Sequence, residues 1–160
     1  MKNILLAAAL LVSLPAFAQS AAAPPTKLYA SSADVQALIA KAKAEHKGGN
    51  TVELVVNDEG YPMQLEYRTD ITPPSIHPTH AELIEVIEGS CTLVTGGKMV
   101  GLKPGATPGA MTQSGTSIEG GSKQHIAKGD YIIVPENVPH WFGELDGTLV
   151  LMSIHLPRAR

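Results

Sequence analysis

Two segments of the sequence, about fifty residues apart, carry side chains that could hold a metal ion. The first reads HisProThrHisAlaGlu at residues 77–82, and the second is the run at residues 129–140 that ends in ProHis. Together they supply three imidazoles and one carboxylate, those of His77, His80, His140 and Glu82. Zinc, manganese, iron, nickel and copper all bind such groups. The two segments therefore predict a site for a divalent transition metal, whose identity the ligand types leave open.

The elements that must position these side chains have the pattern of β-strands. After Gly49 the chain consists of short apolar or alternating runs, separated by Gly, Pro, Asn and Asp. These runs cover residues 51–56, 62–68, 80–88, 90–95, 124–127, 130–134, 138–143 and 148–156. Many short strands at close spacing predict an all-β sandwich or barrel.

The N-terminal part of the chain contains three other predicted segments. Residues 1–18 combine a short positive start, an apolar run too short to span a bilayer comfortably, and small residues at a cleavage site. They predict a cleaved Sec-type signal peptide, hence a periplasmic or secreted protein without a stable membrane anchor. Residues 19–30 are expected to form a flexible lead-in. Residues 31–49 predict a surface helix with Ser31 or Ser32 as its cap.

A glycine-rich segment at residues 96–121 interrupts the run of strands. It contains eight glycines and few large side chains that could anchor it. We therefore expect a long mobile loop at the rim of the barrel. Such a loop is either a functional lid or a tolerated surface insertion, and composition does not separate the two.

The second candidate segment resembles the second sequence motif of the cupin superfamily. Five residues separate Gly129 from Pro135, one separates Pro135 from Asn137, and two separate Asn137 from His140. The motif usually has Gly at the position of Asn137. Asn tolerates a left-handed backbone almost as Gly does, so the tight turn before His140 remains feasible.

The first candidate segment is similar to the first cupin motif, with one departure. Six residues separate Glu82 from Gly89, as in that motif. The motif usually places two histidines, one residue apart, before the Glu. Counting back puts His77 at the second of these positions and Ser75 at the first, so one expected ligand is missing. His80 could replace it.

The strand pattern leaves two ligand sets open. His80 and Glu82 are two residues apart, so an extended strand points both to the same face. His77 has the opposite parity, but Pro78 cannot make a normal ladder bond and indicates a bend or bulge. The site is then either His77, Glu82 and His140, or these three with His80. If His80 is not a ligand, it is the best candidate general base, because it lies within a few residues of the predicted metal and histidine is the usual acid or base near neutral pH.

The resemblance covers residues 63–155 and implies a fold and two classes of function. The implied fold is all-β, a cupin-type jelly-roll β-barrel over residues 50–160 with one N-terminal helix. The implied activity is dioxygenase-, isomerase- or lyase-type chemistry on a small oxygenated molecule at a divalent metal. The alternative is a non-catalytic module that binds a small ligand or a metal. Cupin-like barrels often pair through an edge strand, and residues 51–56 and 62–68 could form such an edge in a homodimer.

The charge of the chain argues against nucleic acid as a partner. The formal net charge is −3, and the sequence contains no basic patch. Its arginines are Arg68, Arg158 and Arg160. A chain with this charge distribution lacks the cationic surface that phosphate backbones require, which leaves a small molecule as the expected ligand.

Two further residues could do chemistry, but a structural role is expected for both. Cys91 has no second cysteine with which to form an internal disulfide, so we expect a small apolar residue inside a strand. His155 alternates with Leu151 and Ser153 in the last predicted strand, and its side chain could point into the barrel or away from it. We expect a polar residue on the strand surface.

Overall fold

The computed structural model describes residues 25–58, 60–105, 107 and 109–157. The expected signal peptide at residues 1–18 and most of the lead-in lie outside these residues. The described elements, in chain order, are α1 (Ser32–Glu45), β1 (Asn50–Val56), β2 (Met63–Arg68), β3 (Ser75–Ile76), β4 (His80–Glu88), β5 (Ser90–Thr95), β6 (Lys98–Val100), β7 (Gln113–Ser114), β8 (Ser117–Glu119), β9 (Ser122–Ala127), β10 (Tyr131–Val134), β11 (His140–Leu145) and β12 (Leu149–Pro157). All eight predicted strands are present. No helix in this part of the chain is long and apolar enough to cross a membrane.

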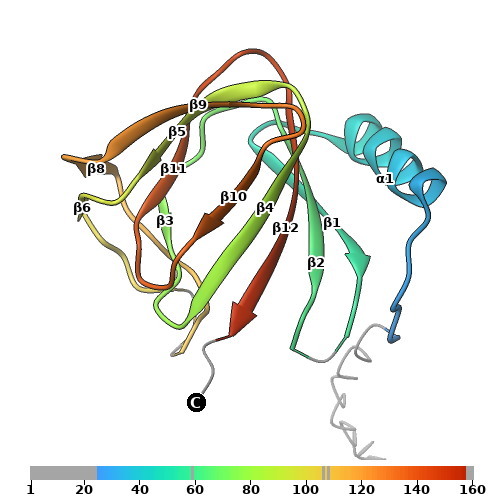
Figure 1. Cartoon of the computed structure of the whole chain (residues 1–160), viewed down its shortest axis with the longest axis horizontal. Helices are drawn as coiled ribbons and strands as arrows, with labels where there is room; N and C mark the ends of the chain where they lie inside the picture. Colours follow the sequence, from blue (N-terminus) through green and yellow to red (C-terminus); the bar gives the residue numbers. More distant parts are fainter. Residues whose placement is uncertain (1–24, 59, 106, 108, 158–160) are drawn as a thin grey trace, which may run out of the picture.

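The strands form two antiparallel five-stranded sheets that pack face to face (Figure 1). One has the order β1-β2-β12-β4-β10 and the other the order β7-β3-β11-β5-β9. Their facing side chains form one apolar core, made of Ile84, Val86, Cys91, Leu93, Ile126, Val134, Phe142, Leu149 and Leu151. This arrangement is the expected all-β jelly roll with one helix.

Cys91 lies in the core, as predicted for a small apolar residue. Its side chain is fully buried, and burial raises the pKa of the thiol to about 11. A thiol with such a pKa is protonated at neutral pH and is a poor nucleophile. The structure therefore gives Cys91 a packing role.

The helix covers the outer face of the first sheet beside β1 and β2 (Figure 1). Ser31 is its N-cap, and the Ser31 and Asp34 side chains each accept a hydrogen bond from the other residue's backbone N–H. Ile39 and Ala42 are buried in a second apolar cluster, together with Val55 of β1 and other strand residues. The helix thus shields part of the outer face of the sheet that contains β4 and β12 from solvent.

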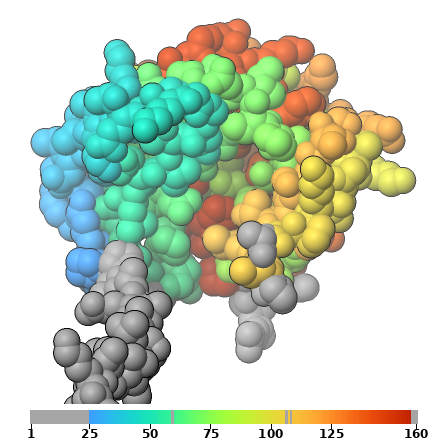
Figure 2. Space-filling model, turned by 180° about the vertical axis from the view of Figure 1, so that it is seen from behind, coloured from blue at the N-terminus to red at the C-terminus, as the bar shows by residue number. Residues whose placement is uncertain are grey.

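The glycine-rich segment is more ordered than its composition predicts, so the expectation of one long loop is wrong in part. β6 pairs with β8 in a two-stranded ribbon, and β7 pairs with β3 in the second sheet. The reason is that some glycines allow close packing here. A Cβ on Gly115 would lie 2.3 Å from Sδ of Met99, and one on Gly97 would lie 2.3 Å from the carbonyl oxygen of Glu119. In Figure 2 this segment (yellow) and α1 (cyan) flank a face on which part of the C-terminal strand (red) is visible.

Candidate metal centre

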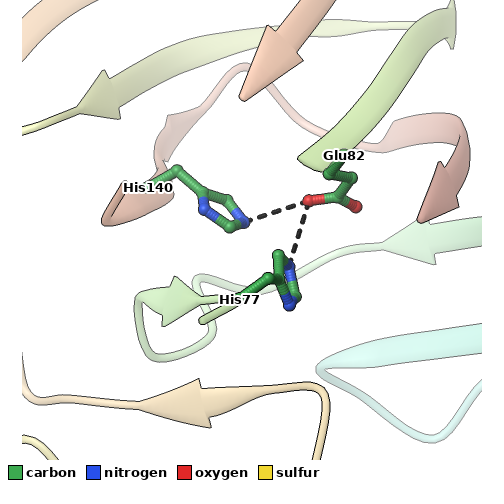
Figure 3. Close-up of side chains that lie close together, drawn as sticks. All are labelled: His77, Glu82 and His140. Atoms are coloured by element: carbon green, nitrogen blue, oxygen red, sulfur yellow. Dashed lines mark ion pairs between the residues drawn. The ribbon is translucent and has the colours of Figure 1, made fainter. Parts of the chain in front are cut away.

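Three of the four predicted ligands come together between the two sheets. His77, Glu82 and His140 form a cluster whose potential ligand atoms all lie within 4.8 Å of one another. One carboxylate oxygen, Oε2 of Glu82, is 3.1 Å from Nε2 of His140 and 3.3 Å from Nε2 of His77 (Figure 3). The three residues are 3 to 5% exposed, so bulk water hardly reaches them.

The backbone around the cluster explains how distant segments meet. His77 follows the short strand β3, and its carbonyl oxygen accepts a 2.7 Å hydrogen bond from the backbone N–H of Asn137. Asn137 has a φ of 58°, the left-handed conformation expected at this motif position. His140 begins β11 directly across from Ser75 of β3. The turn before His140 therefore joins both candidate segments through one hydrogen bond.

Oxygen acceptors on the outer side of each ring set the imidazole tautomers. Nδ1 of His77 lies 3.4 Å from the carbonyl oxygen of Met111 and 3.1 Å from Oγ1 of Thr112. Nδ1 of His140 lies 3.3 Å from the carbonyl oxygen of Val138. Because a carbonyl only accepts, each Nδ1 carries a proton, so Nε2, which faces the cluster, is the nitrogen that each ring can offer to a metal. Metal-binding histidines have this arrangement.

The inner side of the cluster contains a buried carboxylate oxygen. Oε2 of Glu82 is buried and has no hydrogen-bond partner, although two ring nitrogens are close to it. Burial raises the pKa of the Glu82 carboxyl, but the His140 and His77 imidazoles outweigh burial and hold that pKa well below its usual range. The carboxylate is therefore ionised. A bound cation would neutralise this ionised oxygen and take the place of any proton on the two facing Nε2 atoms, so the residues present fit a divalent metal.

His80 lies outside this cluster. It is the first residue of β4, is half-buried, and its Nδ1 is 2.9 Å from Oγ1 of Thr79. It shares a face with Glu82, but two residues along a strand correspond to a shift of about 7 Å. The structure thus assembles the three-ligand set, while a general-base role for His80 stays a hypothesis.

His155 is buried beside the cluster, so the expectation of a polar residue on the strand surface is wrong. The residue is 6% exposed, and its Nε2 lies 3.3 Å from Nε2 of His77 and 3.8 Å from Oε1 of Glu82. Burial lowers the pKa of His155, and this effect outweighs the nearby Glu82 charge, which acts in the opposite direction. The lowered pKa favours the neutral ring. The alternation of His155 with Leu151 and Ser153 could have indicated its position. All three side chains point to the same face of the strand, and Leu151 and Ser153 are both buried.

The cluster lines a cavity of about 180 Å³. At roughly 30 Å³ per molecule, this is the volume of about six waters. The lining beyond the histidines is largely polar and includes Gln64, Glu66, Arg68, Thr112 and Trp141. The cavity thus has room for a small polar molecule beside the cluster.

A second pair of buried charges faces the same cavity. Arg68 donates to Oε2 of Glu66 through Nε, at 2.9 Å, and through Nη2, while Nη1 donates to Oγ1 of Thr72 at 2.6 Å. The amide of Asn50 donates to the same Glu66 oxygen at 2.8 Å. The guanidinium carbon also lies 4.7 Å from the centre of the Phe142 ring. This pair is satisfied within the chain and forms a wall of the cavity.

No protein-family model and no curated protein matches the chain in sequence. Several solved structures do resemble it in three dimensions.

Hydroquinone 1,2-dioxygenase PnpCD, in complex with Cd²⁺ and 4-hydroxybenzonitrile, matches with a TM-score of 0.56 at 17% identity, over 75% of this chain and 71% of that one. A protein provisionally named mannose-6-phosphate isomerase, from Ralstonia eutropha JMP134, matches with a TM-score of 0.50 at 14% identity, over 72% of this chain and 94% of that one. Cobalt(II) HppE in complex with Tris buffer matches with a TM-score of 0.50 at 14% identity, over 69% of this chain and 55% of that one. At such identities the likeness shows a shared fold.

Proposed function

We propose that this protein, which has the fold of the cupin superfamily, is a metal-dependent enzyme that acts on a small oxygenated molecule. His77, Glu82 and His140 would hold a divalent transition metal. The observation that carries the proposal is the buried Oε2 of Glu82, which has no hydrogen-bond partner and lies between two Nε2 atoms. A buried charge without a donor is costly unless something compensates it, and a metal does so.

The ligand set supports an open metal site. Two histidines and one carboxylate bind a metal through three positions and leave others free, as in non-haem iron(II) sites. A metal in such a site would polarise a carbonyl or enolate oxygen of a bound molecule. Zinc, manganese, nickel and copper accept the same ligands, so the donor set does not select one metal.

The chain itself would bind and enclose the substrate. Gln64 and Thr112 offer polar atoms to the cavity, and Trp141 forms part of its lining. Nε1 of Trp141 donates to the carbonyl oxygen of Thr72 at 2.7 Å, which fixes the indole in place. The cavity volume of about 180 Å³ favours a compact substrate such as a small acid, a diketone or a small sugar fragment.

A cobalt-loaded sample tests the proposal. We expect purified protein to bind one Co²⁺ per chain, with visible absorption bands that shift when pyruvate or acetylacetone is added. The shift reports an exchangeable coordination position. Turnover of either compound, or of a related compound from a screened panel, would support catalysis. If none of the small oxygenated molecules changes the absorption bands, the coordination shell is closed and the protein is a non-catalytic binding module. Failure to bind Co²⁺ would refute the metal centre itself.

Export is part of the same proposal. Residues 1–18 have the features of a Sec-type signal, so the chain would cross the membrane unfolded and acquire its metal in the periplasm or outside the cell. N-terminal sequencing of the protein from a periplasmic fraction tests this. A mature chain that begins near Gln19 is expected, and an intact N-terminus in the cytoplasm would contradict export.

A homodimer through β1 is a further part of the proposal. β1 lies at the edge of its sheet, and its Val52 and Leu54 are exposed, whereas β2 is an inner strand. An exposed edge with apolar side chains is suited to pairing with a second copy. Light scattering should give the mass of two chains, and a monomer mass at working concentration would reject the dimer.

A further inference from the structure

We infer that His155 of β12 is the fourth metal ligand of this chain and takes the place of the histidine that is missing at Ser75. The inference rests on the proposed metal centre. It makes that centre a set of three imidazoles and one carboxylate, with the third imidazole supplied by the last strand of the first sheet.

The distances in the cluster match those between ligands on one metal ion. Metal bonds of about 2.1 Å place neighbouring ligand atoms about 3.0 Å apart at right angles and about 3.4 Å apart at tetrahedral angles. Oε2 of Glu82 lies 3.1 Å from Nε2 of His140 and 3.3 Å from Nε2 of His77. Nε2 of His155 lies 3.3 Å from Nε2 of His77. This contact is of the same length as those within the three-ligand cluster.

Strand register directs the His155 side chain to the cluster. In the β4–β12 pair, His155 is directly across from Glu82, so both side chains stand next to each other on the inner face. In the β3–β11 pair, Ser75 is directly across from His140. Ser75 and His155 therefore flank the cluster from two different sheets, and both line the same cavity. A neutral hydroxyl is a poor ligand, whereas an imidazole is a good one.

The His155 ring is free to adjust. Its Nδ1 is buried and has no hydrogen-bond partner, while the outer nitrogens of His77 and His140 are held by oxygen atoms. His155 stands outside the group whose ligand atoms all lie within 4.8 Å of one another, so its ring must move toward the cluster when metal binds. Since nothing holds the outer nitrogen, this movement changes only the contact between Nε2 of His155 and Nε2 of His77, which bonds to a shared metal would replace.

The inference changes the number of positions left for a substrate. Three protein ligands leave three positions of a six-coordinate metal, whereas four leave two. Two positions still accommodate one small molecule that binds through two oxygen atoms.

X-ray absorption of the zinc-loaded protein tests the inference. We expect three imidazoles around the metal in the wild type, two in His155→Ala and three again in His155→Ala with Ser75→His, because Ser75 lies across from His140. Zinc affinity, measured by competition with a chelator, should fall at least about tenfold in His155→Ala and recover in the double variant. His125→Ala is the matched control, since His125 pairs with Asp146 at the surface, and it should change neither readout.

The outcomes separate this inference from the proposed function. Two imidazoles around the metal in the wild type would overturn the role of His155 and leave the three-ligand centre intact. The same conclusion would follow if both His155→Ala and His155→Gln bound zinc within twofold of the wild-type affinity. A wild type that binds no zinc would overturn both. Should His155→Ala fail to fold, the imidazole count of the wild type still decides.

Discussion

Two buried carboxylates line one cavity, and the chain surrounds them in opposite ways. Glu66 is 7% exposed and receives hydrogen bonds from Arg68 and Asn50. Glu82 is 3% exposed and faces ring nitrogens, and its Oε2 has no donor. β12 passes from one to the other, with Ser153 near Glu66 and His155 near Glu82.

The difference indicates which carboxylate is structural and which is functional. Burying a charge is costly, and the chain compensates Glu66 with a guanidinium of its own. It supplies no fixed cation to Glu82, only imidazoles whose Nε2 atoms face inward. The Glu66 end of the cavity is complete without a ligand, while the Glu82 end would be completed by the proposed metal.

The largest expected effect on metal affinity comes from Glu82. Glu82→Gln should weaken zinc binding by more than about a hundredfold, or about 2.7 kcal/mol, because the only anionic ligand is lost. The zinc affinity of Glu66→Gln should stay within a few-fold of wild type, because Glu66 contributes no ligand atom to the cluster. Chelator competition measures both. Equal losses in the two variants would remove the distinction between the two carboxylates.

Stability should respond in the opposite order. Glu66→Gln leaves the buried Arg68 without its anionic partner and should lower the free energy of unfolding by about 3 kcal/mol. Glu82→Gln should cost the metal-free protein less than half as much, because the new amide can donate to a free Nε2. Urea unfolding of both metal-free variants checks the order, and a larger loss for Glu82→Gln would reverse our interpretation.

The hydrogen bond behind His77 should have a smaller effect. Thr112→Val removes an oxygen that lies 3.1 Å from Nδ1 of His77, and it should weaken zinc binding by about tenfold. The matched control is Thr116→Val, since Oγ1 of Thr116 donates to the carbonyl oxygen of Val100, in β6. If both variants bind zinc as wild type does, the glycine-rich segment does not support the metal end of the cavity.

The smallest expected effect concerns the turn that joins the two segments. Asn137 has a φ of 58°, so Asn137→Ala should cost about 1 kcal/mol of unfolding free energy, while Asn137→Gly should be nearly neutral. Thermal unfolding of the metal-free protein gives the comparison. A glycine variant as unstable as the alanine variant would mean that the Asn side chain, and not the backbone conformation, matters there.

The sequence predicts more of the ligands than of their surroundings. Motif spacing points to His77, Glu82 and His140, which the structure brings together, and also to His80, which lies outside that cluster. It does not identify His155, because the contact with Glu82 arises from the register of two strands far apart in the sequence. Alternation gives the parity of a side chain but not its neighbour on the next strand.

Composition alone also gives a wrong prediction for the glycine-rich segment, which is more ordered than the expected loop. Glycine permits both mobility and close packing, and only the neighbours decide which of them applies. Here Gly115 lies against Met99, and the ribbon that results leads into the Thr112 contact behind His77. These contacts depend on the folded chain.

The most direct test of the metal centre is the metal content of the purified protein after dialysis against zinc and then against metal-free buffer. We expect about one zinc per chain in the wild type and almost none in His140→Ala, because His140 provides the ligand atom closest to Glu82. The same content in both proteins, whether negligible or full, would contradict a metal centre at His77, Glu82 and His140.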